Sequence, residues 1–143
     1  MTRIDFYILS SAEQHTAWLY CCRLVQKAWQ HGHQVFICCE DDASCQAVND
    51  LLWTFRPDSF LPHSLASEAG KTTDTICIGT ANQLGEHCDV LVNLCRETPP
   101  QFSRFKRLSE IVFQQPEWLN ASRQRYSAYQ QRGYPLHKHD VAA

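Results

Sequence analysis

The segment IDFYILSSAEQHTAWLYCCRLVQKAWQHGHQVFICCEDD, residues 4–42, sets the expected architecture of this chain. It begins with the apolar run 4–9 and continues, after a Ser-Ser-Ala-Glu turn typical of a helix cap, into an amphipathic stretch over 15–30. Gly32 ends that helix, and the β-rich run 34–39 follows. The segment therefore predicts a strand, a helix and a second strand in one unit.

Strands and helices continue to alternate downstream of this unit. Short apolar runs predict buried strands, whereas longer amphipathic runs and a proline at a first helical position predict helices. The further elements expected are a helix over 43–53, strands over 75–78 and 89–94, a helix over 99–108, a strand over 110–113 and a helix over 116–133. This order favours an α/β fold with an open, mostly parallel sheet and helices on both faces, because parallel strands require crossover connections.

The composition is that of a single globular domain. With 143 residues, of which 44% are hydrophobic, the chain can bury a core without disulfides or metals. We expect one domain over 1–139 and a short tail over 140–143. No run of about 18 apolar residues and no signal-peptide cleavage pattern occur, which indicates a cytoplasmic protein with no membrane partner. The eight cysteines include the adjacent pairs Cys21-Cys22 and Cys38-Cys39 and are interpreted as buried thiols in a reducing compartment.

A nucleotide- or metal-dependent enzyme is the alternative that this fold class raises. The turn after the first strand, Ser10 to Glu13, has no glycine that would let the backbone approach a phosphate, and its glutamate would repel one. Gly70-Lys71-Thr72 resembles the end of a phosphate-binding loop, but Leu65 stands where that motif requires its first glycine. No Cys-x-x-Cys pair marks a zinc site. We therefore favour a Rossmann-like fold without cofactor or catalytic residues, and an enzyme that uses the switch-point crevice of the sheet remains the alternative.

Charge is unevenly distributed along the chain, although the formal net charge is only −2. Residues 99–139 contain seven Lys or Arg and two Asp or Glu, whereas residues 1–98 contain six and twelve. The basic C-terminal third of the chain is either the solvated surface of a helix or a docking face for an acidic partner. Charge alone does not separate the two interpretations.

The aromatic segment LLWTFRPDSFLPH, residues 51–63, indicates a surface for a protein partner. Its prolines force irregular backbone, which normally lies at the surface, yet the segment carries Trp53, Phe55 and Phe60. It either folds back onto the core or presents aromatic anchors to another protein.

The helix expected over 116–133 divides into two faces at about 100° per residue. The expected core side consists of Trp118, Ala121, Ser122, Ala128 and Tyr129, and a stripe beside it consists of Leu119, Arg123, Tyr126 and Gln130. On this stripe Arg123 can bind a terminal carboxylate while Leu119 and Tyr126 contact an apolar side chain. Nearby positive potential is expected from Arg125, Arg132 and Lys138. An ordinary amphipathic surface is the alternative interpretation.

Three blocks of this sequence resemble the chi subunit family of bacterial DNA polymerase III. The blocks are NDLLWTFRPDSFLPH over 49–63, DVLVNLCRETPPQFSRFKRLSEIV over 89–112 and SRQRYSAYQQRGYPLHKH over 122–139. The opening FYIL, the helix that contains Cys-Arg-Leu and the run GHQVFICCED resemble the same family. The resemblance extends in order over nearly the whole chain.

This resemblance implies a noncatalytic adaptor that acts as a monomer within a hetero-complex and contacts nucleic acid only indirectly. In the family, one surface binds the psi subunit, which connects chi to the clamp loader, and another binds the acidic, phenylalanine-ending tail of single-stranded-DNA-binding protein. The psi interface, or that of an equivalent clamp-loader component, is expected at Trp53, Phe60, Phe55, Pro62 and His63. The tail-binding residues are expected to be Arg123, Tyr126, Leu119, Ser127 and Gln130. Family members carry lysine where this chain has Leu119 and Ser127.

Overall fold

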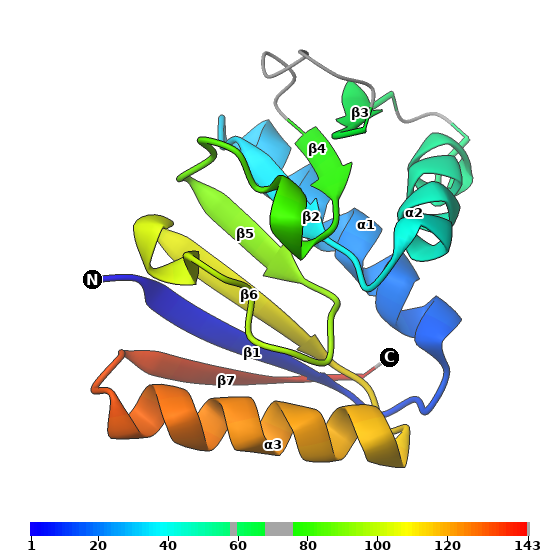
Figure 1. Ribbon diagram of the computed structural model, residues 1–143. Coiled ribbons are helices and arrows are strands. Elements are labelled where there is room, and N and C mark those ends of the chain that lie inside the picture. The colour runs from blue at the N-terminus through cyan, green and yellow to red at the C-terminus, as the bar shows by residue number, and fades with distance from the viewer. Residues whose placement is uncertain (58–59, 68–75, 143) are drawn as a thin grey trace.

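The computed structural model describes residues 1–57, 60–67 and 76–142, and these form one seven-stranded sheet with helices on both faces (Figure 1). The strands are β1 (Arg3–Leu9), β2 (Val35–Cys38), β3 (His63–Leu65), β4 (Ile76–Gly79), β5 (Val90–Asn93), β6 (Arg107–Val112) and β7 (Leu136–Val141). Their order is β3-β4-β2-β5-β6-β1-β7, and every ladder between these described strands is parallel. The expected α/β fold with an open parallel sheet is confirmed.

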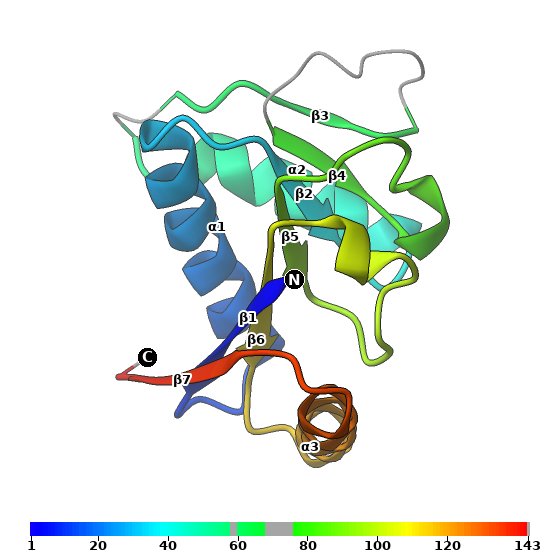
Figure 2. The same cartoon turned by 90° about the vertical axis from the view of Figure 1, so that its left-hand side faces the viewer.

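Three α-helices connect the strands in the described part of the chain. They are α1 (Gln14–Gln30), α2 (Asp42–Thr54) and α3 (Pro116–Gln131). Two short 3-10 helices, η1 (Ala81–Gln83) and η2 (Phe102–Arg104), lie in loops. Helices α1 and α2 pack on one side of the sheet and α3 packs on the other (Figure 2).

The ends of the helices follow local sequence signals. Asp41 caps α2 by accepting a hydrogen bond of 2.8 Å from the backbone N–H of Ser44. Pro116 is the first residue of α3, as expected, and Gly133 follows its end at φ +81°, a conformation that favours glycine. Gly32 follows the end of α1 in the same left-handed conformation, at φ +83°. The helix cap expected within residues 10–13 is not formed by Ser10, since the structure places the N-cap of α1 at Glu13 without a side-chain cap bond.

The cysteines are distributed over both layers of the core. Cys39 packs under α1 and α2, whereas Cys38 faces the α3 side, as strand alternation requires. Seven of the eight thiols are buried and Cys88 is exposed. Burial raises the pKa of Cys22 to about 12, so that this thiol stays neutral and acts as a small apolar group.

Three elements differ from the sequence prediction. The helix expected over 99–108 is wrong: only the 3-10 turn η2 forms there, and the chain enters β6 at Arg107 because Arg107 pairs with Arg3 and Val90 on the neighbouring strands. Strands β3 and β7 were not predicted. Strand β7 continues to Val141 and so includes two residues of the tail expected over 140–143. Residue 75 and Gly70-Lys71-Thr72 lie outside the described residues.

Candidate functional site

A cavity of about 340 Å³ lies on the α3 side of the sheet, between that helix and strands β1, β6 and β7. Its floor consists of Phe6, Ile8 and Val112, which strand alternation turns toward α3. The wall from α3 is made by Leu119, Ser122, Arg123 and Tyr126. Gln114 and Lys138 complete the lining from the loop after β6 and from β7.

The apolar part of this cavity is held in place by aromatic packing. The half-buried ring of Tyr126 meets Phe6 edge to face, with ring centroids 5.1 Å apart and planes at 69°. Ser122 donates a hydrogen bond of 2.7 Å to the backbone oxygen of Leu119, so its hydroxyl is satisfied within the helix. The floor can therefore take an apolar side chain without burying an unpaired polar group.

Two cations border the cavity. The ammonium of Lys138 lies 5.1 Å from the centroid of the Tyr126 ring, a distance at which a cation is attracted by the face of the ring. Arg123 is exposed on α3, and neither Arg123 nor Lys138 takes part in any ion pair between described residues. The cavity thus combines an apolar floor with positive charge that has no carboxylate partner in the described chain, which suits a ligand with an acidic group beside an apolar one.

The structure brings together part of the stripe expected on the last helix. Leu119, Arg123 and Tyr126 all line the cavity, whereas Ser127 and Gln130 are exposed and do not line it. Residue 127 is turned about 100° away from 126 around the helix, and residue 130 is one turn farther along.

The positive potential expected around this stripe comes from one residue only among the three named. Lys138 lines the cavity, but Arg125 is buried and Arg132 packs over the rings of Phe102 and Tyr134. The expected core side of α3 was also wrong in part, since Ala128 is exposed.

Arg125 is buried because a strand residue supplies its counterion. Its guanidinium donates from Nε and Nη2 to both carboxylate oxygens of Glu110, each at 3.1 Å, and Glu110 is fully buried in β6. The hydroxyl of Tyr129 donates to the same carboxylate at 2.7 Å. Burial and the negative charge of Glu110 raise the pKa of Tyr129, so that it remains a donor. This network fixes the position of α3 on the sheet and thus the geometry of the cavity.

The switch-point crevice lies where β1 leads to α1 on one face and β6 leads to α3 on the other. Gln114 bridges the two strand ends there: its backbone N–H donates to Ser11 O at 2.8 Å and its side-chain amide donates to Leu9 O at 2.9 Å.

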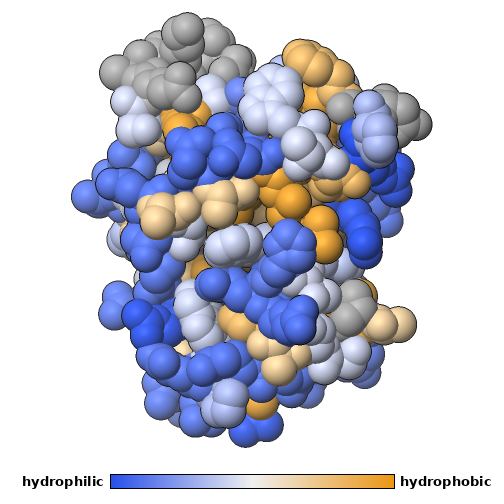
Figure 3. All heavy atoms as spheres, turned by 90° about the vertical axis from the view of Figure 1, so that its right-hand side faces the viewer, coloured by the Kyte–Doolittle hydropathy of each residue, from blue (hydrophilic) through white to orange (hydrophobic). Residues whose placement is uncertain are grey.

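Seen from the end toward which β5 and β6 point, hydrophilic residues cover most of the surface and apolar ones gather in a strip across the middle (Figure 3). In the described ranges no group of three or more His, Cys, Asp or Glu is arranged to hold a metal ion.

A second surface lies at the β3 edge of the sheet. Trp53 at the end of α2 is 49% exposed and Phe60 is 69% exposed, and their ring centroids lie 5.7 Å apart. His63 contacts Trp53, with its ring centroid 4.3 Å from that of Trp53, and its ring nitrogens lie 2.6 Å from Leu61 O and 3.2 Å from Asn49 O. Apart from Met1, Trp53 and Phe60 are the exposed large hydrophobic residues of the described chain.

The other residues expected at this surface have mixed environments. Phe55 is half-buried and packs against the core under α1 and α2, and Pro62 is also half-buried. Leu61 is buried, so the segment over 51–63 both folds back onto the core and leaves two aromatic rings exposed. Residues 58 and 59 lie outside the described residues.

The two surfaces are at opposite edges of the sheet. Trp53 and Phe60 adjoin β3, the first strand in the order, and the cavity beside α3 is closed by β7, the last. Six spacings of about 4.8 Å between neighbouring strands separate these edges by about 29 Å. A protein segment bound at one edge therefore leaves the other edge accessible (Figure 1).

Comparison with known proteins identifies the family. The model of the DNA polymerase III chi subunit family matches residues 1–137. This chain belongs to that family. A DNA polymerase III subunit chi from Pseudomonas aeruginosa is 38% identical to it over 139 residues, covering 97% of this chain and 96% of the relative. The relative of the same name from Haemophilus influenzae is 28% identical and covers 96% of each chain, and that from Escherichia coli is 26% identical and covers 80% of this chain and 79% of its own.

Membership of the chi family gives this chain a role in DNA replication, as an accessory component of a complex with other protein subunits. No described helix is long and apolar enough to cross a membrane. The match to the family model and the similarity to its members confirm the family resemblance seen in the sequence.

Proposed function

We propose that this chi-family chain is a noncatalytic adaptor between the clamp loader and single-stranded-DNA-binding protein, acting in the cytoplasm. The cavity beside α3 would bind the acidic C-terminal tail of the single-stranded-DNA-binding protein, and the surface of Trp53 and Phe60 would bind the psi subunit or an equivalent component. In this proposal each partner occupies one edge of the sheet.

The observation that carries the proposal is the pairing of Arg123 and Lys138 with an apolar floor. A tail that ends in phenylalanine has a ring to place on Phe6 and Tyr126 and a terminal carboxylate to place against the Arg123 guanidinium. Acidic residues that precede the ring would lie in the positive potential of Lys138.

Lys138 supports the proposal in a second way. The family resemblance implies lysines at the position of Ser127 and near Leu119, and this chain has neither. Lys138 reaches the same cavity from β7, and it stands over Tyr126 in the described structure. We infer that an ammonium from the strand replaces one from the helix.

The psi assignment is supported by the exposed ring pair. Trp53 and Phe60 present large apolar surface at the edge of a domain whose other large hydrophobic groups, Met1 excepted, are covered in the described ranges. Aromatic residues of this kind dominate the binding energy of many protein interfaces.

The test is a calorimetric titration of the chain with a peptide that copies the acidic, phenylalanine-ending tail. Arg123→Ala should weaken binding about tenfold or more, because a charge-assisted hydrogen-bonded pair is lost. Arg132→Ala is the matched control, since Arg132 caps the C-terminal end of the same helix and does not line the cavity. Undiminished binding by Arg123→Ala would contradict the assignment of the cavity.

A further inference from the structure

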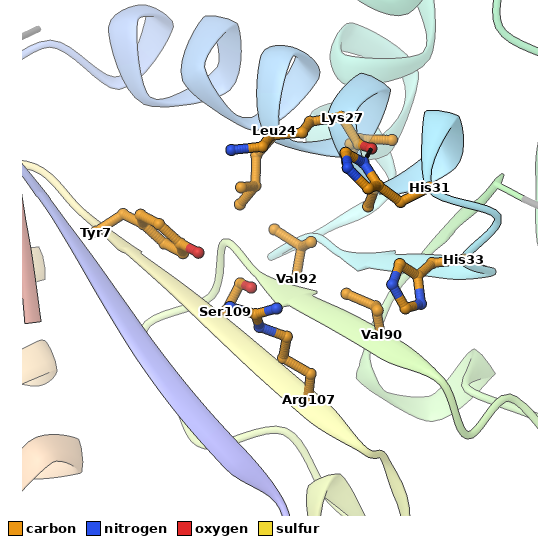
Figure 4. Close-up of a pocket in the computed structure, with 11 residues that line it drawn as sticks. Tyr7, Leu24, Lys27, His31, His33, Val90, Val92, Arg107 and Ser109 are labelled. Carbon is orange, nitrogen blue, oxygen red and sulfur yellow. Dashed lines mark hydrogen bonds between the residues drawn. The ribbon is translucent and has the colours of Figure 1, made fainter. Parts of the chain in front are cut away.

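A second cavity, of about 240 Å³, opens on the opposite face of the sheet, between α1 and strands β1, β5 and β6. Side chains from α1, from the loop after it and from the strands point toward the same space (Figure 4). The cavity includes Val90 and Arg107, the first residues of β5 and β6, so it lies toward the amino ends of these strands. It is thus separate from both surfaces of the proposed adaptor and from the crevice at Gln114.

One part of this cavity is apolar. Val25, Val90 and Val92 are buried, and Leu24 and Ala28 cover them from α1 as half-buried residues. An apolar cavity of about 150 Å³ is known to be large enough for a benzene ring. This cavity has room for one ring together with a small polar group.

The other part of the cavity is polar and comes from β1 and β6. Ser109 is 3% exposed, and Figure 4 shows the guanidinium of Arg107 beside it and the hydroxyl end of Tyr7 turned toward the cavity. Burial, and to a lesser extent the charge of Asp5, raise the pKa of Tyr7. Tyr7 is therefore a neutral donor over the ordinary pH range.

Positive charge exceeds negative charge around this polar part. Asp5 is fully buried and accepts hydrogen bonds from Arg107 at 2.9 Å, from Arg3 at 3.2 Å and from His139 at 2.9 Å. Burial favours the neutral acid, but the bonds from His139, Arg107 and Arg3 lower the pKa of Asp5 below its ordinary value. One carboxylate is thus shared by two arginines and an imidazole, and Arg107 remains electropositive toward the cavity.

The rim carries further nitrogen groups. Lys27 is exposed in the last turn of α1, where a cation offsets the negative end of the helix dipole. His31 lies beside it, with Nδ1 2.8 Å from Lys27 O, and His33 also lines the cavity and is paired with Asp89 at 3.3 Å. Asp89 contacts this rim through His33 and also accepts a hydrogen bond from the backbone N–H of residue 34.

From this arrangement we infer that the cavity between α1 and the sheet binds a small organic anion. Its carboxylate or phosphate contacts Arg107 and the hydroxyls of Tyr7 and Ser109, with Lys27 at the entrance. Its apolar body, about the size of one ring, packs on Leu24, Val90 and Val92. The inference does not depend on the adaptor role, because the cavity shares no lining residue with either partner surface.

The test uses three probes with the same ring: phenyl phosphate, benzoate and the uncharged benzyl alcohol. Methyl NMR spectra of the full chain report on the leucine and valine residues of the cavity. We expect saturable shifts at Leu24, Val90 and Val92 with phenyl phosphate and benzoate, and a much weaker response to benzyl alcohol. Equal affinity of all three probes, or a response at these methyl groups to an oligodeoxythymidine but to neither small anion, would overturn the inference.

Three variants and one control locate the site. Lys27→Gln should weaken binding of phenyl phosphate about two- to fivefold, as expected for an exposed charge, while Arg23→Gln one turn earlier should leave it unchanged. Ala28→Leu keeps every charge, replaces the best helix former by another strong one and fills the cavity, so it should abolish binding. Retained binding by Ala28→Leu shows the cavity is not the site. Arg107→Gln also removes a partner of Asp5, and its melting temperature must be compared before its affinity is interpreted.

Discussion

Replacing Lys138 by alanine tests whether the strand lysine substitutes for the missing helix lysines. Its ammonium lies 5.1 Å from the Tyr126 ring and is exposed to solvent, which screens its attraction for an acidic ligand. An unscreened estimate for two charges 4 Å apart at a dielectric of 20 is about 4 kcal/mol, but exposed pairs are measured at about 0.2–1 kcal/mol. The exposed value applies here, and 1 kcal/mol corresponds to a factor of about five in Kd.

Lys138→Ala should therefore weaken binding of the acidic tail peptide up to about fivefold, less than Arg123→Ala. The assay is fluorescence anisotropy with a labelled peptide at several salt concentrations. The difference between wild type and Lys138→Ala should shrink as salt rises, since the lost interaction is electrostatic. Lys106→Ala is the control, because it removes an exposed lysine that does not line the cavity. A Kd at low salt that is the same for Lys138→Ala and Lys106→Ala would refute the compensation.

Three further predictions concern the body of the domain. Arg125→Ala leaves the buried Glu110 carboxylate without its cation and should lower the free energy of unfolding by about 3–5 kcal/mol, measured by urea denaturation. Burial opposes ionisation of Asp5, but hydrogen bonds from its cationic partners lower its pKa, so its contribution to stability is present above the unfolded pKa of about 3.9 and is lost as pH falls through the lower folded value. Asp5→Asn should accordingly flatten the dependence of unfolding free energy on pH in the acid range. A maleimide should label one thiol of the native chain, Cys88, and eight after unfolding, and rapid labelling of several native thiols would contradict the buried assignment.

The first strand, α1 and β2 were predictable because each satisfies a strong local pattern. The apolar run over 4–9, the amphipathic stretch over 15–30 and Gly32 all agree with the observed bounds to within a few residues, although the expected side-chain cap of α1 did not form. Strand β7 lacks such a pattern, because LHKHDV at the sheet edge alternates around polar residues and is held by pairing with β1. Its detection requires knowledge of the neighbouring strand, which periodicity does not supply.

The candidate site was predictable only as far as one helix can indicate. Leu119, Arg123 and Tyr126 follow from helical spacing, but Phe6 and Ile8 come from the other end of the chain. Their signal was the alternation of residues 4, 6 and 8 toward one face of β1. Arg125 was misplaced because an arginine is expected at the surface unless it is paired, and its partner Glu110 lies in a strand that the helical pattern cannot locate.

The strand order also determines how this domain would respond to mechanical load. A pull between the β3 edge and the β7 edge runs across the strands, so the inter-strand ladders carry the same force in series. The shortest ladder joins β3 to β4 through three residue pairs, whereas β1 and β7 are joined by six. Under tension β3 would separate from the sheet first. The surface at Trp53 and Phe60 would therefore be disrupted before the cavity beside α3.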